Sequence, residues 1–485
     1  DYKETMRKAF VIVDQDERRD MIKKGLLETA EKLGGYVWHN ADLLEEINYL
    51  VEYPTPLYGR IDDEFLKLPV PAVVTPMRDH QRYYPVRKED GSLMPYFLTV
   101  RNGGTKALEN VQHGNEKVLR ARLDDAKFFF ENDRKKTLEG HRDDLTRINY
   151  QEGLGDMRDK ADRLQKLTAF IGKDWHFTDE EMKDADRAAF LSKSDLATGM
   201  VTEFTELQGE MGKEYALLDG EKPEVAQAIF EQYMPRFSGD ILPKESIGRA
   251  LSLADKLDNL SATFLRGLIP TGSQDPFALR RQTIGAVNIL TDGKIHWDIR
   301  RGIAKALELL PGEQEVKDKV LSQVEDFFRQ RIRAILLDNG IAYDIIDAVL
   351  AGPVDDIYAI FLKAQAMTES HLKEEADLRQ AVTRLANITK GKTGGKVDPA
   401  LFEEDAEKNL EAALAKAMAA VEPLYREYRY ADALPYLKEL TAPINDYLDN
   451  VMVMVKDEAV KNNRISQLLK TLSFFDAWGD FSKLV

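Results

Sequence analysis

The 485-residue sequence contains no cysteine, and this absence removes several kinds of chemistry. Disulfides, thiolate metal sites and cysteine nucleophiles are all excluded. No stretch approaches the roughly 20 consecutive apolar residues that a membrane span requires. The opening residues, DYKETMRKAF, also lack the apolar core of a signal peptide. We therefore expect a cytoplasmic protein without a membrane partner.

The common motifs of nucleotide-binding and catalytic sites are also missing. No GxxxxGK[ST] loop occurs, and GKTGGK at 391–396 has neither the spacing nor the preceding strand that cradles phosphate. No GxSxG turn and no HExxH pair occurs either. None of the seven histidines lies between residues 177 and 295. We expect no catalytic residue and no metal site in this chain.

The net charge of −16 disfavours one further class of protein. Non-specific coating of nucleic acid depends on neutralising phosphates with Lys and Arg, so DNA is not an expected partner. A local basic surface on an acidic protein can still engage a folded RNA through its shape and its loops.

The length and the periodicity predict a multidomain, predominantly helical protein. Residues 1–125 are typical of an α/β domain, with short strands at 72–77 and 96–100 and a hairpin turn at Asp90-Gly91. Residues 126–305 and 306–485 have helical spacing. Pro/Gly-rich connections are expected at 268–276 and 390–399, and the second contains a basic loop at 390–398.

Candidate RNA-binding side chains fall into three groups. Aromatic and basic residues crowd together before the turn, and such residues stack on unpaired bases and contact phosphate; since Tyr83 and Tyr84 alternate, at least one is expected to pack inward. Polar groups on helices are more often a solvated face. The candidates are His80, Gln81, Arg82 and Tyr83; Asn115, Lys117, Arg120 and Arg122; and Asn450, Asn463 and Arg464.

Several long strings together resemble the β subunit of the bacterial heterotetrameric glycyl-tRNA synthetase. They are LPVPAVVTPMRDHQRYYPV, GNEKVLRARLDDAKFFFEND, MVTEFTELQGEMGKEYA, YMPRFSGDILP, ADKLDNL and PTGSQDPFALRRQ. The resemblance implies that about 200 residues of the usual N-terminal region are lacking before Asp1. It implies a β subunit that binds tRNA(Gly) for a catalytic α subunit in an α2β2 assembly. ATP and Mg²⁺ are then expected on the α subunit, and no cofactor on this chain.

The same resemblance implies a degenerate HD-type domain in the middle region. Hydrolytic HD proteins bind metal through a His-Asp dyad, and here the corresponding residues are Ser194 and Asp195, with Asp255 and Asp258 in ADKLD. A hydroxyl is a poor replacement for imidazole at a divalent metal. We therefore expect a scaffold.

The final segment resembles the helical anticodon-binding domain of arginyl-tRNA synthetases. Its matching strings carry Arg384, Asn387, Asn450 and Arg464, which we expect to be exposed and to contact the anticodon stem or loop. The apolar residues of NVMVMV at 450–455 are expected in the core.

Two alternatives remain open for the whole chain, a metal-dependent HD phosphohydrolase and a helical interaction protein without RNA function.

The degenerate dyad leads to one prediction. Ser194→Ala should leave aminoacylation by the reconstituted enzyme near normal, because no metal chemistry is expected at this position. The measurement is glycine charging of tRNA, and a large loss of activity with intact folding would show that the dyad still matters.

Overall fold

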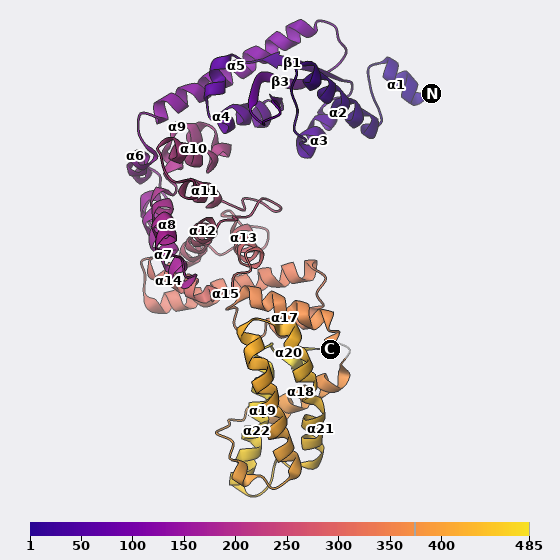
Figure 1. The fold of residues 1–485 in the computed structure, drawn as a ribbon, viewed down its shortest axis with the longest axis vertical. Coiled ribbons are helices and arrows are strands. Elements are labelled where there is room, and N and C mark those ends of the chain that lie inside the picture. The colour runs from indigo at the N-terminus through magenta and orange to yellow at the C-terminus, as the bar shows by residue number, and fades with distance from the viewer. Residues whose placement is uncertain (373–374, 485) are drawn as a thin grey trace. The chain divides into compact units, whose positions relative to one another are not determined.

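The computed structural model describes residues 1–372 and 375–484, and it confirms the predominantly helical fold class (Figure 1). Its chain divides into two compact units. Unit 1 comprises Asp1–Gln165, Thr178–Tyr233 and Glu245–Leu251, and unit 2 comprises Lys166–Phe177, Met234–Lys244 and Ser252–Val485. The three-way division at 125/126 and 305/306 stays a prediction. Its first boundary falls inside a continuous helix, Leu108–Asp133.

Unit 1 contains the sheet and a series of helices. Its elements are α1 Tyr2–Lys8, α2 Gln15–Lys32, α3 Ala41–Leu50, β1 Pro54–Arg60, η1 Asp63–Lys67, α4 Val70–Thr75, η2 Pro76–His80, β2 Tyr84–Arg87, β3 Leu93–Asn102, α5 Leu108–Asp133, α6 Leu138–Arg142, η3 Asp143–Arg147, α8 Asp179–Leu191, η4 Ser194–Ala197, α9 Gly199–Glu203, η5 Thr205–Leu207, α10 Glu210–Leu218 and α11 Pro223–Glu231.

All the regular elements of unit 2 among the residues that are described are helices, joined by loops. Its elements are α13 Leu279–Asp292, α14 Ile299–Glu308, α15 Gln314–Asp338, α16 Tyr343–Val349, α17 Ile357–Glu369, α18 Ala376–Thr389, η7 Pro399–Leu401, α19 Asp405–Arg426, α20 Tyr430–Lys438, α21 Thr441–Asn450, α22 Glu458–Asp476 and η8 Phe481–Lys483. Helices α7 Met157–Asp174 and α12 Ser246–Leu265 have residues in both units.

The sheet is antiparallel with the strand order β1-β3-β2. Helices α2 and α3 cover one face, where Ile22 and Ile47 pack with Leu98 of β3. The predicted hairpin between β2 and β3 is confirmed, and Gly91 in its turn has a φ of +84°. Such a left-handed conformation favours glycine.

The strand predicted at 72–77 is wrong, because this segment forms α4 and the single π turn η2. Ala72, Val73, Val74 and Thr75 are all buried. A helix buried on every side shows the same continuous apolar run as a buried strand, so periodicity cannot separate the two. Pro71 occupies the first turn of α4, where its missing N–H is tolerated.

The C-terminal part of unit 2 is a helical bundle in which α18, α19, α21 and α22 run alongside one another (Figure 1). Leu385, Leu410, Tyr447 and Leu468 fill its core. Both expected connections are confirmed: residues 268–276 separate α12 from α13, and residues 390–398 form the loop between α18 and α19.

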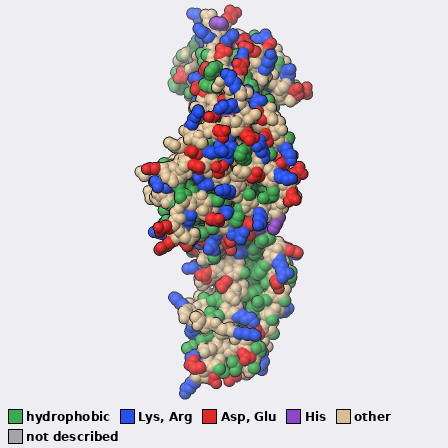
Figure 2. Space-filling model, turned by 90° about the vertical axis from the view of Figure 1, so that its left-hand side faces the viewer, with side chains coloured by type: hydrophobic (Ala, Val, Ile, Leu, Met, Phe, Trp, Pro, Cys, Tyr) green, Lys and Arg blue, Asp and Glu red, His purple; other side chains and the backbone are tan. Residues whose placement is uncertain are grey.

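The surface offers charges of both signs. On the face drawn in Figure 2, Lys and Arg side chains are interspersed with Asp and Glu side chains. None of the helices in residues 1–372 and 375–484 combines the length and apolar character that a membrane span needs. A recognition surface must therefore be sought in local groups of residues.

A pair of glycines tests the packing of unit 1. A Cβ added at Gly59 of β1 would overlap the ring of Phe97, whereas a Cβ added at Gly114 of α5 would meet no atom of the described residues within 4 Å beyond the neighbouring backbone of α5. Gly59→Ala should lower the free energy of unfolding by about 1–3 kcal/mol through overpacking. Gly114→Ala is the control and should be neutral or slightly stabilising. Thermal denaturation measures both, and equal effects would contradict the packing described.

Candidate nucleic-acid interface

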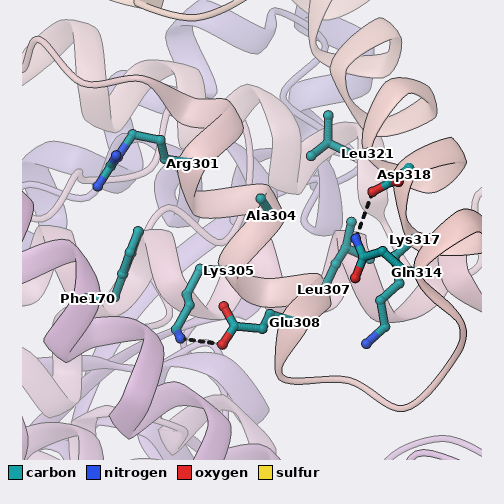
Figure 3. Close-up of a pocket in the computed structure, with 10 residues that line it drawn as sticks. All are labelled: Phe170, Arg301, Ala304, Lys305, Leu307, Glu308, Gln314, Lys317, Asp318 and Leu321. Atoms are coloured by element: carbon teal, nitrogen blue, oxygen red, sulfur yellow. Dashed lines mark hydrogen bonds and ion pairs between the residues drawn. The ribbon is translucent and has the colours of Figure 1, made fainter.

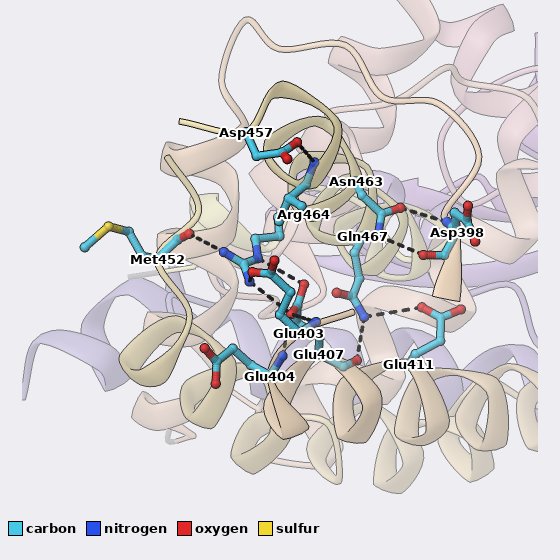
Figure 4. A network of polar contacts seen from close by, with 11 residues as sticks. Asp398, Glu403, Glu404, Glu407, Glu411, Met452, Asp457, Asn463, Arg464 and Gln467 are labelled. Carbon is cyan, nitrogen blue, oxygen red and sulfur yellow. Dashed lines mark hydrogen bonds and ion pairs between the residues drawn. The ribbon is translucent and has the colours of Figure 1, made fainter. Parts of the chain in front are cut away.

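Arg464, the residue expected to be exposed on the last long helix, is instead buried at 3% exposure. It lies in the second turn of α22, and its guanidinium faces the start of α19 (Figure 4). Its Nε donates to Glu407 Oε1 at 3.0 Å, and its Nη2 donates to Glu407 Oε2 at 3.2 Å and to Glu403 Oε2 at 3.1 Å. The expectation of an exposed Arg464 is therefore wrong, because a carboxylate from α19 draws it into the bundle.

Glu407 performs two functions at the same position. It is fully buried, and it forms a capping box in which its Oε2 accepts the backbone N–H groups of Glu403 and Glu404, each at 2.9 Å. Burial by itself raises the pKa of Glu407. The hydrogen bonds from Arg464 and from the two N–H groups outweigh burial, and the pKa lies below its usual value. The carboxylate thus stays ionised and ties α22 to the first turn of α19.

Residues of α22 also hold two loops at this end of the bundle (Figure 4). Arg464 Nη1 donates to the carbonyl of Met452 at 2.9 Å. Asn463, also buried, accepts from Asp398 N at 2.7 Å and donates to Asp398 O at 3.0 Å. Ser466 Oγ accepts from Gly395 N at 2.8 Å. We call loop 390–398 and segment 451–457 together the loop pair.

The outer surface of the loop pair is basic and apolar. Lys390, Lys396 and Lys456 are exposed. Met452 and Met454 are 72% and 60% exposed, and Lys392 Nζ lies 3.4 Å from the sulfur of Met454. Lysines neutralise backbone phosphates, while polarizable thioethers pack against apolar faces. The surface therefore presents ammonium groups and exposed thioethers side by side.

The expectation that the apolar residues of 450–455 form core is wrong for the two methionines. Val451 and Val453 are buried, and Met452 and Met454 point outward. A strict alternation of Val and Met is visible in the sequence, and alternation indicates one buried and one exposed face. The alternation therefore predicts that Met452 and Met454 are exposed, although methionine is an apolar residue.

The other candidates of unit 2 lie on helices beside the loop pair. Arg384 on α18 pairs with Asp449 on α21 at 2.9 Å. Asn387 is exposed near the end of α18. Asn450 donates to the backbone and side chain of Asp446 at 3.0 and 2.8 Å. Their contacts with RNA stay predictions.

The cluster expected at residues 80–83 is spread over different environments in unit 1. His80 Nε2 lies 3.4 Å from Glu206 Oε1, and its ring is 5.6 Å from that of Phe204. Arg82 pairs with Glu46 at 2.8 Å, and Gln81 is half-buried. Tyr83 is buried and stacks on Phe97 at 4.7 Å between ring centroids. A core residue cannot stack on a base, so Tyr83 is a poor contact candidate.

The candidates on α5 remain accessible. Lys117, Arg120 and Arg122 are exposed, and Asn115 is half-buried. Arg120 pairs with Asp62 at 2.9 Å. Lys117 and Arg120 also line a cavity between α5 and the end of β1.

The Ser194–Asp195 pair is enclosed in unit 1. Ser194 and Asp195 are both fully buried, and no hydrogen-bond partner is found for Ser194 Oγ among the described residues. Asp195 accepts from Gly209 N at 2.7 Å and from the Tyr233 hydroxyl at 2.9 Å. Burial raises the pKa of Asp195 against these hydrogen bonds. Both carboxylate oxygens of Asp195 accept hydrogen bonds from the protein itself, so these contacts give the residue a structural role. Asp258 is also buried.

Unit 2 contains a cavity of about 390 Å³ between α14 and α15 (Figure 3). Its polar groups are largely engaged: Arg301 pairs with Asp174 at 2.9 Å, Lys305 pairs with Glu308 at 2.9 Å, and Lys317 donates to Leu310 O at 2.6 Å. In residues 1–372 and 375–484, no three His, Asp or Glu side chains gather as metal ligands would.

Two family models match this chain. Residues 1–351 match the family described as glycyl-tRNA synthetase beta subunit, and residues 378–476 match the DALR anticodon binding domain. The second match contains both parts of the loop pair and the Arg464–Glu407 contact.

Curated relatives agree with the family models. A glycine–tRNA ligase beta subunit from Clostridioides difficile is 44% identical over 486 residues, covering 100% of this chain and 70% of the relative. Proteins of the same name from Desulforamulus reducens and Halothermothrix orenii are 43% and 44% identical over 489 and 474 residues. They cover 100% and 96% of this chain, and 70% and 68% of the relatives.

The burial of Arg464 gives a prediction opposite to that for an exposed residue. Arg464→Ala leaves the carboxylate of Glu407 buried without its cation, and we expect a loss of about 3–5 kcal/mol in unfolding free energy. Hydrogen exchange of the α19 and α22 amides measures the change locally. The double variant Arg464→Met/Glu407→Leu removes both charges and should recover much of the loss. If the amides of α19 and α22 exchange in Arg464→Ala as slowly as in the wild type, this role of Arg464 is contradicted.

The same pair predicts a dependence on pH. Because the folded pKa of Glu407 is depressed, its contribution to stability is complete above the ordinary carboxylate value of about 4.3. It is lost as the pH falls through the depressed value. Hydrogen exchange of α19 followed from pH 6 to pH 3 should show this loss in the wild type and not in the double variant.

Proposed function

Because the chain belongs to the family of glycyl-tRNA synthetase β subunits, we propose that it binds tRNA(Gly) through the loop pair for a catalytic α subunit. The family membership rests on the match over residues 1–351 and on relatives more than 40% identical across the chain. The word subunit in their names implies an α partner, and the DALR domain implies tRNA binding.

The loop pair is the observation that supports the proposed RNA surface. It places two exposed methionines beside lysines in the domain that matches an anticodon-binding family. An anticodon loop is single-stranded, so its bases present apolar faces and edges that a duplex conceals. Thioethers and ammonium groups are complementary to those faces and to the adjoining phosphates. Arg464 acts in this proposal by positioning segment 451–457 through the Met452 carbonyl.

The proposed reaction joins ATP, glycine and tRNA to give glycyl-tRNA, AMP and diphosphate. The α subunit supplies its active site, and ATP and Mg²⁺ bind there, while the β chain carries no cofactor. The part of this chain is to orient the tRNA, because holding a reactant in the productive position lowers the entropic part of the barrier. We further propose an α2β2 assembly in the cytoplasm.

The proposal is tested by reconstitution. This chain, purified together with an α subunit, should charge tRNA with glycine, and neither subunit alone should do so. In the complex, Lys392→Glu/Lys396→Glu should weaken binding of tRNA(Gly) at least tenfold, because two attractive charges become repulsive. Fluorescence anisotropy with labelled tRNA measures the affinity.

The matched control is Lys416→Glu, which changes an exposed lysine of the same domain outside the loop pair. It should change the affinity by less than twofold. An equal loss in Lys416→Glu would mean general repulsion by an acidic protein. Failure of the complex to prefer tRNA with glycine anticodons over other tRNAs would overturn the proposed function itself.

A further inference from the structure

A second cationic site lies in unit 1, far along the sequence from the loop pair. Strand β1 ends at Arg60, and the chain turns through Asp62 into η1 beside helix α5. Helix α5 contributes residues at positions 113, 116, 117 and 120, a spacing that places them on one helical face. Together these elements enclose a cavity of about 310 Å³ with buried Phe65 among its lining residues. We call this cavity the α5 cup; its polar lining is Arg60, Asp62, His113, Glu116, Lys117 and Arg120.

The two carboxylates of the α5 cup are used to build it. Glu116 Oε1 accepts the backbone N–H of Arg60 at 2.9 Å and the amide of Gln112 at 3.1 Å. This contact fixes the end of β1 against α5. Asp62 pairs with Arg120 at 2.9 Å. Both acids therefore face donors of the protein, and Glu116 holds the lining in place through the backbone of β1.

The cations of the α5 cup form fewer contacts within the protein than its carboxylates do. In the described part of the chain Lys117 makes no ion pair, and Arg60 has only a 3.4 Å contact with Asp63, in which both side chains are more than half exposed. Exposed pairs of this kind contribute little and are readily exchanged. Asp63 and Asp124 lie outside the lining and contact Arg60 and Arg120 at 3.4 and 3.9 Å. Lys117 is therefore the lining cation that has no ion pair among the described residues, and it points to the cup as the place for an external anion.

Gly114 adds an independent observation. It lies inside α5, one turn before Lys117, and no atom of the described residues lies within 4 Å of the place a Cβ would take, apart from the neighbouring backbone of α5 itself. Glycine weakens a helix interior relative to alanine, and no packing contact with another described element requires it here. A glycine with open space before it leaves the helix backbone accessible to a ligand that approaches closely.

We propose that the α5 cup is an anion site that holds a backbone phosphate of the bound tRNA. Its volume is near the lower limit for ligand sites and suits a phosphate with its attached sugar. Arg and Lys beside an open helix face are the usual donors to phosphate, and such contacts position a nucleic acid without reading its sequence. This inference rests on the proposed function, since it assumes that the chain binds tRNA.

Lys117→Glu in the complex with the α subunit tests the site, with tRNA(Gly) affinity measured over a range of salt concentrations. The variant should weaken binding about tenfold and reduce the slope of log affinity against log salt by about 0.7–0.9, the value for one lost phosphate contact. Gly114→Glu removes no lining residue and places a negative charge beside the cup, and it should act in the same direction. Lys135→Glu is the control, because Lys135 is an exposed lysine just beyond the other end of α5; it should stay within twofold of wild type.

Each other outcome overturns a defined part of the proposal. Unchanged affinity and salt slope in Lys117→Glu would remove the α5 cup, while a wild-type complex that neither binds nor charges tRNA would remove the proposed function. Equal losses in Lys117→Glu and Lys135→Glu would indicate general repulsion and no site. Inorganic phosphate provides the last arm: if it raises the melting temperature of wild type but not of Lys117→Glu, with equal tRNA affinities, the site serves small phosphate compounds and not RNA.

Discussion

The ion pair between Arg464 and Glu407 is the constraint on which the C-terminal bundle depends. A buried carboxylate is stable only when donors compensate for lost water, and Glu407 has four, two from Arg464 and two from the N–H groups that begin α19. The same guanidinium also donates a hydrogen bond to the carbonyl of Met452. One side chain thereby connects the N-terminal ends of α19 and α22 with the segment between α21 and α22. The exposed residues of the loop pair owe their positions to this interior contact.

Unit 1 uses buried carboxylates in a related way. Asp133, at the end of α5, accepts the N–H groups of Gly199 and Met200 and the hydroxyl of Tyr215, at 2.7–2.9 Å. Asp195 accepts one N–H and one hydroxyl in the same manner. In both cases an acid organises backbone that is distant in sequence. The expectation that Ser194 and Asp195 are the remnant of an HD dyad stays a prediction, whereas the contacts of Asp195 give that residue a role in the fold.

Much of the architecture was predictable from the sequence, since it follows from local rules. Helical spacing predicts the helices after residue 126, and the Asp90-Gly91 turn predicts the β2–β3 hairpin. The failures have tertiary causes. Residues 72–77 are buried all round, so their apolar run carries no period. The sequence around Arg464 indicates a surface residue because its partner is 57 positions away. The sequence around Tyr83 indicates a ligand contact because its stacking partner, Phe97, lies on another element. The exposure of Met452 and Met454 is different, because the alternation of Val and Met at 451–454 was visible in the sequence and predicts one exposed face.

The way α22 holds loop 390–398 has a consequence for the thermodynamics of association. A glycine-rich loop normally loses much conformational entropy when a ligand orders it. Here Gly395 and Asp398 are already hydrogen-bonded to Ser466 and Asn463, and Gly394 lies too close to Leu469 for a larger side chain. Folding has therefore ordered the C-terminal half of the loop before any ligand binds. A ligand that uses this conformation does not have to order these residues, and such preorganisation shows itself mainly in slow dissociation.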